Sequence, residues 1–218
     1  MAEPNPFSGL PQDEIRRLIA VARRRRFGRN EVVFHRDDPA DTLHLIARGR
    51  FAVRVTTQLG ESVTVAVHGP GEAFGELALV EEGMSRSTSV VALEPGETYA
   101  VAHEDFTRLR RQYPAVNEVL VRLLARRLRR QSELLVEALF VSAESRVLRR
   151  LVELATLYGR GQPGTEVPLT QEDIAGLAGT SRATVNRVLR AEAKRGTVEL
   201  RRGRTYVLEP ETLAGRSR

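Results

Sequence analysis

The stretch from Ala115 to Ala143 contains neither glycine nor proline, and this constrains the fold more than any other feature of the sequence. Apolar residues recur in it every three or four positions, which is the spacing of one face of an α-helix. They are Val116, Leu120, Leu123, Leu124, Leu128, Leu135 and Leu139. We therefore predict one long helix with a leucine-rich stripe. Arginines cover most of its other faces, which favours a coiled-coil seam between two chains over a helix lying on the core of its own domain.

Short strands separated by glycine turns occupy the region before this helix, from about residue 27 to residue 103. Apolar and polar residues alternate at 42–46, 51–55 and 63–67, and glycines fall between these runs. Glycine suits such turns because it adopts positive φ angles without strain. The pattern predicts a small β-barrel or sandwich, with a helix before it at about Gln12 to Arg23.

After Ser142 the pattern becomes helical again and ends in two short strands, at about 197–200 and 205–208, on either side of a turn at Arg202-Gly203. Within this part, Thr170 with an acid three residues later predicts a capped helix, and Ser181 predicts the cap of a second one.

Gly179 supplies a left-handed turn between these two helices, and small Ala175 allows them to approach closely. Their shared core would consist of Ile174, Ala178, Val185 and Val188. This arrangement is typical of a helix-turn-helix, and the hairpin behind it makes the motif winged. The alternative is an ordinary helical hairpin with a solvated polar face.

Basic charge is concentrated in this last third of the chain. From Ser142 onward 14 Lys and Arg stand against 9 Asp and Glu, a net +5, whereas residues 1–141 hold 20 and 19, a net +1. Arginines on an exposed helix can pair with guanine, and hydroxyl groups can contact phosphates. We therefore predict binding of double-stranded DNA through Thr170, Gln171, Ser181, Arg182, Ala183, Thr184, Asn186, Arg187 and Arg190. The arginine run at 23–26 is a weaker candidate, interpreted as a solvated strand entry.

A second candidate site lies in the strand-rich region, where Phe74-Gly75-Glu76-Leu77-Ala78-Leu79 is followed by an acidic loop and Arg86-Ser87. A helical turn starting at Gly75 would direct backbone N–H groups at an anion, Arg86 offers a guanidinium fork to a phosphate, and Ser87 offers a hydroxyl group. The Glu76 carboxylate suits a ribose 2′-hydroxyl. Together they fit a cyclic nucleotide, and the alternative is a plain ion pair between Glu76 and Arg86.

Several other classes of protein are excluded. The chain has no cysteine, so disulfides, thiolate zinc sites and cysteine-ligated iron–sulfur clusters cannot form. His35, His44, His68 and His103 are scattered without metal-ligand spacing, and no P-loop, dinucleotide-binding or GxSxG motif occurs, so we expect no metal, no haem and no enzymatic activity. No apolar run approaches the ~20 residues of a membrane helix and the start of the chain lacks signal-peptide character, so we expect a cytoplasmic protein without membrane contacts.

In this order, β-roll, phosphate-binding segment, long helix and winged helix-turn-helix resemble the Crp/Fnr family of bacterial transcription regulators, over about Phe27 to Leu208. GELALVEEGMSRS resembles the cyclic-nucleotide cassette of that family, LARRLRRQSE its dimer helix and LTQEDIAGLAGTSRATVNRVL its recognition unit. Within the family, the chain looks most like the cyclic AMP receptor proteins.

The resemblance implies an α+β protein with an N-terminal cyclic-nucleotide-binding, double-stranded jelly-roll-like β-roll at 1–113, a dimerisation helix at 114–141 and a winged helix-turn-helix domain at 142–218. It implies a homodimer on a pseudo-palindromic DNA site, with RNA polymerase as a further partner. The cyclic phosphate and ribose would be bound by Gly75, Glu76, Leu77, Ala78, Arg86 and Ser87. Gln131 and Ser132 would approach the base from their own and the partner subunit. Cyclic AMP is the favoured ligand and cyclic GMP the second candidate.

Two positions depart from the family pattern. Gln131 stands where cyclic AMP receptors usually have threonine, and its amide could address either an adenine or a guanine edge. Ala183 stands where the family often has a glutamate that accepts from cytosine N4, so that base contact is missing. Two other functions stay open: a DNA-binding dimer that needs no ligand, and a cyclic-nucleotide module that acts on a protein partner.

Overall fold

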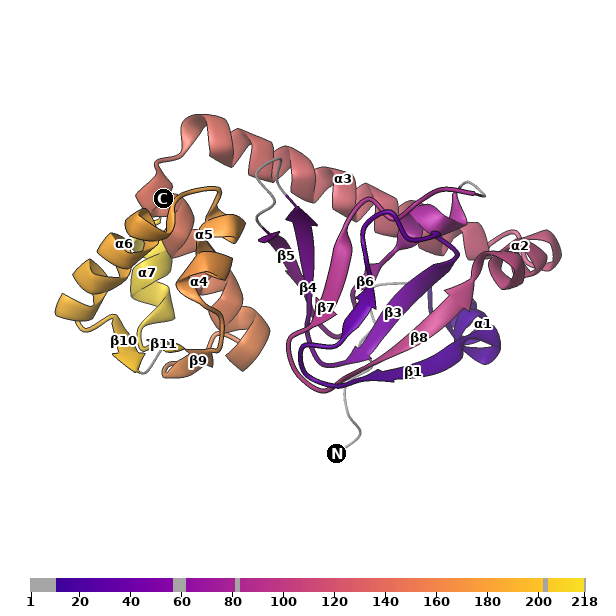
Figure 1. Cartoon of the computed structure of the whole chain (residues 1–218), viewed down its shortest axis with the longest axis horizontal. Helices are drawn as coiled ribbons and strands as arrows, with labels where there is room; N and C mark the ends of the chain where they lie inside the picture. Colours follow the sequence, from indigo (N-terminus) through magenta and orange to yellow (C-terminus); the bar gives the residue numbers. More distant parts are fainter. Residues whose placement is uncertain (1–10, 57–61, 81–82, 202–203, 218) are drawn as a thin grey trace. The chain divides into compact units, whose positions relative to one another are not determined.

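The structure is a computed structural model and describes residues 11–56, 62–80, 83–201 and 204–217. The chain divides into two compact units, Met1–Ser62 with Ala66–Arg130, and Val63–Val65 with Gln131–Arg218 (Figure 1). The boundary between Arg130 and Gln131 falls within the predicted long helix, so this helix contributes residues to both units. Each unit is described by itself below.

Two antiparallel four-stranded sheets form the β-roll of the first unit. One sheet has the order β1-β8-β3-β6 and consists of Arg23–Phe27, Gly96–Ala102, Thr42–Arg48 and Ala73–Phe74. The other has the order β2-β7-β4-β5 and consists of Val32–Phe34, Ser89–Ala92, Phe51–Thr56 and Ser62–His68. Aromatic and aliphatic side chains fill the space between them, as the alternating pattern predicted: Phe27, Ile46, Phe51, Val53, Phe74, Val90 and Ala92.

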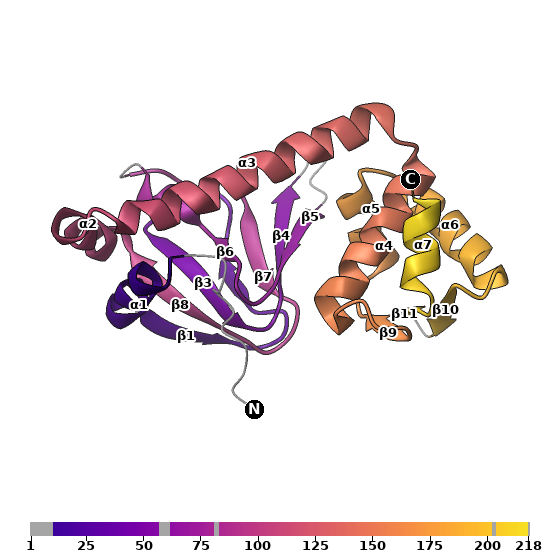
Figure 2. The same cartoon turned by 180° about the vertical axis from the view of Figure 1, so that it is seen from behind.

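Helices cover the outer face of the first sheet. They are α1 (Gln12–Val21), α2 (His103–Gln112) and the first part of α3 (Val116–Phe140), and both views show α1 and α2 at the end of the sheet where β1 begins and β8 ends (Figures 1 and 2). Their apolar residues form a second core against β3 and β8. Since β3 is covered on both faces, Leu43, His44, Leu45 and Ile46 are all buried, and the alternation predicted for 42–46 does not correspond to one solvated face.

Helix α3 ends at Phe140, one residue before the end of the dimerisation helix predicted at 114–141, so the stretch without glycine or proline does not form one continuous helix as far as Ala143. The break needs neither glycine nor proline, because Ser142 is extended (ψ 148°) and caps a new helix, α4 (Ala143–Gly159), by accepting from the Ser145 N–H at 3.1 Å. The leucine-rich stripe is also divided. Val116 and Val119 lie in the core of the first unit, whereas Leu128, Leu135 and Leu139 are 69%, 61% and 66% exposed.

The second unit combines α4 with a three-stranded sheet and three further helices. The sheet has the order β10-β11-β9, from Val198–Arg201, Arg204–Val207 and Thr165–Val167, and the helices are α5 (Gln171–Ala178), α6 (Arg182–Lys194) and α7 (Pro210–Arg216). The helix-turn-helix and both strands of its wing were predicted, whereas β9 and α7 were not. The predicted turn at 202–203 lies outside the described residues. In the described part of the chain, no helix is long and apolar enough to span a lipid bilayer.

Candidate functional site

A tight turn after β6 brings Gly75 against Arg86. Gly75 has a left-handed backbone (φ 79°) and precedes a short 3-10 helix, η1 (Glu76–Leu79), which is the helical turn predicted at this position. A Cβ atom on residue 75 would lie 2.7 Å from Arg86 Nη1 and 2.8 Å from the Thr42 carbonyl oxygen, so both the angle and the space require glycine. The first N–H groups of such a turn have no acceptor within it and are available to an anion.

The guanidinium group of Arg86 is buried and held from one side. Nη1 donates to the Thr42 carbonyl oxygen at 2.8 Å, and Nη2 donates to Thr42 Oγ1 at 2.8 Å and to Asp41 Oδ1 at 3.3 Å. The Phe34 ring lies beneath it, with its centroid 4.1 Å from Cζ. Nε is buried and has no hydrogen-bond partner among the described residues. An unpaired buried N–H costs free energy, so an anionic acceptor at this edge would be favourable.

The charge of Arg86 persists despite its burial. Burial lowers the pKa of its side chain below the ordinary value of an arginine, while the carboxylates of Asp41, Asp38 and Glu76 act in the opposite direction. A guanidinium group stays protonated in proteins, so the site presents a cation at neutral pH. The segment that carries it is fixed by backbone hydrogen bonds, from Arg86 N to Asp38 O and from Asp37 N to Arg86 O, both at 2.8 Å.

Glu76 is also buried, but its ionic partner lies on another element. Its Oε1 is 3.4 Å from Nε of Arg127 on α3, whereas Arg86 forms its ion pair with Asp41 at 3.3 Å. The alternative interpretation, a plain ion pair between Glu76 and Arg86, therefore does not describe this site. The sequence analysis missed the role of Arg127, because the two partners are 51 positions apart and no local pattern links them.

The other predicted cassette residues have different surroundings. Leu77 is 39% exposed, whereas the Ala78 side chain is buried in the roll and its carbonyl oxygen accepts from His103 Nδ1 at 2.6 Å. The side chain of Ala78 is therefore not accessible to a ligand. Ser87 is exposed beside Arg86. Both predicted base-contacting residues are exposed on α3, about one helical turn beyond Arg127: Gln131 and Ser132.

In the second unit, the helix-turn-helix is built as its sequence predicts. Thr170 and Asp173 form a capping box at the start of α5, Gly179 ends that helix in a left-handed conformation (φ 58°), and Ser181 caps α6. All four residues predicted for the shared core are buried: Ile174, Ala178, Val185 and Val188. Arg146 of α4 secures the turn by donating to the carbonyl oxygens of Ala178 at 2.8 Å and Gly179 at 3.0 Å, a contact that the sequence did not indicate.

The predicted DNA-contacting residues lie on the outer side of this motif. Exposed members are Thr170, Ser181, Arg182, Ala183, Arg187 and Arg190, while Gln171, Thr184 and Asn186 are half-buried. Asn186 Nδ2 donates to Gln171 Oε1 at 3.0 Å, which links the two helices at this surface. Arg187 forms an ion pair with Glu144 of α4, so one of the arginines already has an anionic partner.

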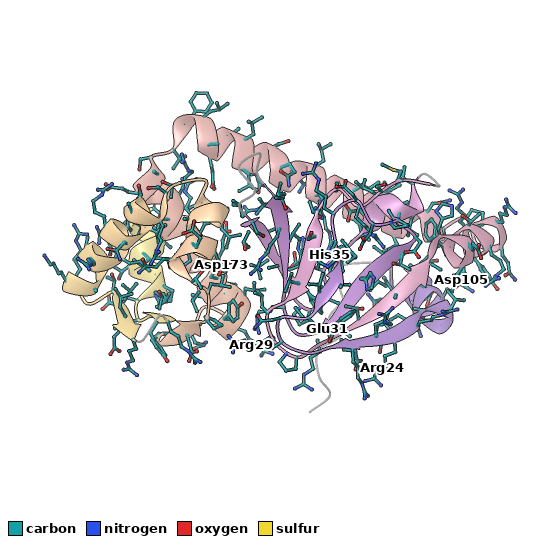
Figure 3. All side chains as sticks on the ribbon, viewed as in Figure 1. Arg24, Arg29, Glu31, His35, Asp105 and Asp173 are labelled. Carbon is teal, nitrogen blue, oxygen red and sulfur yellow. The ribbon has the colours of Figure 1, made fainter. Side chains whose placement is uncertain are left out.

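The arginine run at 23–26 forms β1, with all four arginines exposed. Arg24 and Arg26 share Glu97 of the neighbouring strand, and the Arg24 side chain points away from the sheet (Figure 3). This agrees with a solvated strand entry. Over the described residues, no group of three or more His, Cys, Asp or Glu side chains is arranged to hold a metal ion.

Each of the two domains matches the model of a known family. Residues 24–113 match the family model of the cyclic nucleotide-binding domain, and residues 145–216 match that of the Crp-like helix-turn-helix domain. The two domains together define a DNA-binding transcription regulator with a cyclic-nucleotide-binding domain, which is not a class of enzymes.

Relatives extend this similarity over the whole chain. The chain is 38% identical over 208 residues to the cyclic AMP receptor protein of Thermus thermophilus, covering 95% of this chain and 94% of that one. It is 30% identical over 221 residues to a CRP-like cAMP-activated global transcriptional regulator of Mycobacterium tuberculosis, covering 100% and 98%. The crystal structure of Thermus thermophilus catabolite activator protein is 36% identical with a TM-score of 0.54, covering 98% of both chains. The chain belongs to the Crp/Fnr family of transcription regulators.

Proposed function

We propose that this protein is a homodimeric regulator whose binding to a specific DNA site is controlled by cyclic AMP in the β-roll. The observation that carries the proposal is the buried Arg86 guanidinium, which has an unpaired Nε and lies against the Gly75 turn. A cyclic phosphate supplies the anionic acceptor that this nitrogen lacks. The ribose 2′-hydroxyl of the same molecule would reach the Glu76 carboxylate.

The preference for cyclic AMP is supported by the names of the relatives, which include a cyclic AMP receptor protein and cAMP-activated regulators. Gln131 keeps cyclic GMP as the second candidate, because its amide group both donates and accepts hydrogen bonds.

Dimerisation is supported by a row of exposed apolar residues along α3. Val121, Leu128 and Leu135 are spaced seven residues apart and are 62%, 69% and 61% exposed. Heptad spacing places such residues on one face, which is the arrangement of a two-helix seam. Gln131 and Ser132 follow Leu128 by three and four positions and so flank the same face, where a residue could reach ligand in its own or the partner subunit.

Ligand control follows from differential affinity. Cyclic nucleotide would favour the dimer arrangement that binds it more tightly, and in that arrangement the two α6 helices would enter successive major grooves ~34 Å apart. The positions proposed for base and phosphate contacts are those found on the outer side of the helix-turn-helix, with Arg182 and Arg187 as the base-reading pair.

The decisive experiment is calorimetric titration of the purified protein with cyclic AMP and, separately, with cyclic GMP. Micromolar binding of cyclic AMP, lost in Arg86→Leu and kept in Arg29→Leu, is the expected result, because Arg29 is an exposed arginine of the β1–β2 turn (Figure 3). DNA affinity measured by fluorescence anisotropy with and without the nucleotide completes the test.

The outcomes separate the alternatives. Ligand-independent binding to a specific DNA site, with no heat for either nucleotide, would favour a regulator that needs no ligand. Nucleotide binding without any DNA affinity would favour a module that acts on a protein partner.

A further inference from the structure

A histidine in the aromatic core contacts Thr42, the residue whose hydroxyl and carbonyl oxygens accept hydrogen bonds from Arg86. His44 of β3 is 4% exposed, and its ring stacks on Phe74 with the centroids 5.0 Å apart and an interplanar angle of 12°. The rings of Phe27 and Phe34 lie at 6.3 and 6.1 Å. A polar ring in such surroundings needs hydrogen-bond partners. His44 has two: Thr98 Oγ1, 2.9 Å from Nδ1, and Thr42 Oγ1, 3.3 Å from Nε2.

The direction of these hydrogen bonds follows from what each group can do. The Thr42 hydroxyl has one hydrogen and two lone pairs. Its hydrogen goes to Asp41 Oδ1 at 3.1 Å, because a carboxylate only accepts, and one lone pair accepts from Arg86 Nη2 at 2.8 Å, because a guanidinium only donates. The remaining lone pair then faces His44 Nε2, so we assign the proton of the ring to Nε2, and Nδ1 accepts from the Thr98 hydroxyl.

The imidazole is neutral under ordinary conditions. Burial lowers the pKa of His44 to about 3, and the nearby cations Arg86 and Arg25 act in the same direction. The neutral ring with its proton on Nε2 thus fits both the network and the surroundings. Because the His44 ring is neutral, it adds no positive charge near the Arg86 guanidinium group.

We propose that His44 is a positioning residue for the phosphate-binding Arg86 and acts through the Thr42 hydroxyl. This inference rests on the proposed function of the cassette. The Nε2–H fixes the rotation of the Thr42 hydroxyl, so that a lone pair always faces Arg86 Nη2. Thr42 then holds both terminal nitrogens of Arg86, through Oγ1 and its carbonyl oxygen, and leaves Nε without a hydrogen-bond partner among the described residues. His44 itself touches no ligand.

Two substitutions separate positioning from packing. His44→Phe keeps an aromatic ring between Phe74 and Phe34 but removes both ring nitrogens, and we expect about 5- to 10-fold weaker cyclic AMP binding, the effect of losing one hydrogen bond. His44→Gln removes the aromatic ring but can place an amide N–H near the position of Nε2, and we expect affinity within about twofold of the unaltered protein. Thermal unfolding should rank the variants in the opposite order, because packing favours phenylalanine.

A double-variant cycle tests the route through Thr42. Thr42→Val removes the acceptor for Arg86 Nη2, whereas Thr42→Ser retains it and serves as the control. We expect His44→Phe to have no further effect on cyclic AMP affinity in the Thr42→Val background, since the two residues act as one unit. Nitrogen-15 spectra of the His44 ring should show the neutral form protonated on Nε2.

Specific results would overturn the inference. They are unchanged cyclic AMP affinity in His44→Phe, additive losses in the double variant, or a His44 ring protonated on Nδ1. If the unaltered protein bound neither nucleotide, the proposed function would fail together with this inference, whereas binding that all His44 variants retain would refute the inference alone.

Discussion

Replacing Gly75 with alanine tests the geometry of the cassette more sharply than replacing a charged group. The substitution adds one methyl group to a left-handed residue (φ 79°), which costs about 1–2 kcal/mol for any residue with a Cβ. The methyl group would also meet Arg86 Nη1 at 2.7 Å and the Thr42 carbonyl oxygen at 2.8 Å. Overpacking of this kind costs a further 1–3 kcal/mol, so we expect Gly75→Ala to lower the free energy of unfolding by about 2–5 kcal/mol.

Gly83 provides a matched control, because it has nearly the same backbone angle (φ 77°) and, among the described residues, nothing within 4 Å of an added Cβ atom. Gly83→Ala should therefore cost only the backbone strain, about 1–2 kcal/mol, and leave the ligand site intact. In Gly75→Ala the displaced guanidinium group would lose charge-assisted contacts to the phosphate, which lowers cyclic AMP affinity about 10- to 100-fold. Scanning calorimetry and isothermal titration measure the two effects. Equal stability and equal affinity in the two variants would show that the close contacts at Gly75 do not shape the site.

Three further predictions concern other parts of the chain. Glu144→Gln removes the carboxylate paired with Arg187, so DNA affinity measured by anisotropy should rise a few-fold at low salt, and unchanged affinity would mean that the exposed pair does not compete with DNA. Leu135→Arg should shift the protein from dimer to monomer in sedimentation, whereas Val80→Arg, at a 53% exposed residue beside η1, should leave the dimer intact. The free energy of unfolding should decrease as the pH is lowered from 6.5 to about 3, because in this range the unfolded chain binds a proton at His44 that the folded protein excludes. His44→Phe lacks this dependence, so from pH 6.5 to pH 5 its free energy of unfolding should rise relative to the unaltered protein by roughly 1.5 kcal/mol, and parallel pH profiles would contradict a buried neutral ring.

The helix-turn-helix was predictable in detail because its determinants are local. The capping box of Thr170 and Asp173, the left-handed Gly179 and the cap at Ser181 each act within three or four residues of themselves. The buried positions follow the helical period, so sequence and structure agree residue by residue. The Gly75 turn was predictable for the same reason, since a glycine before a short helical turn needs no distant partner to be recognised.

The unpredicted features depend on partners that are distant in the sequence. A period-two pattern at 42–46 indicates a strand, but only the fold shows that the helices bury Leu43 and Leu45 on one face while the aromatic residues between the two sheets bury His44 on the other. In the sequence, Arg127 does not differ from the other arginines of its helix, and only the structure shows that it lies beside Glu76. The end of α3 at Phe140 lies one residue before the predicted end at 141, but the cause of the break was not predicted, because serine is a weaker breaking signal than glycine or proline and Ser142 ends one helix only by capping the next.

The two halves of the cassette differ in how they are held, and this indicates where a ligand could exert control. Arg86 is fixed entirely by neighbours of the β-roll, through Thr42, Asp41 and the Phe34 ring, so the phosphate half is preformed and gains affinity from that rigidity. Glu76 is paired instead with Arg127 of α3, at the longer distance of 3.4 Å. A ribose hydroxyl that donates to Glu76 would compete for the same carboxylate oxygens. Under the proposed function, we therefore expect a change in ligand occupancy to act on α3 through the sugar half of the site, and the phosphate half to provide affinity without needing to move.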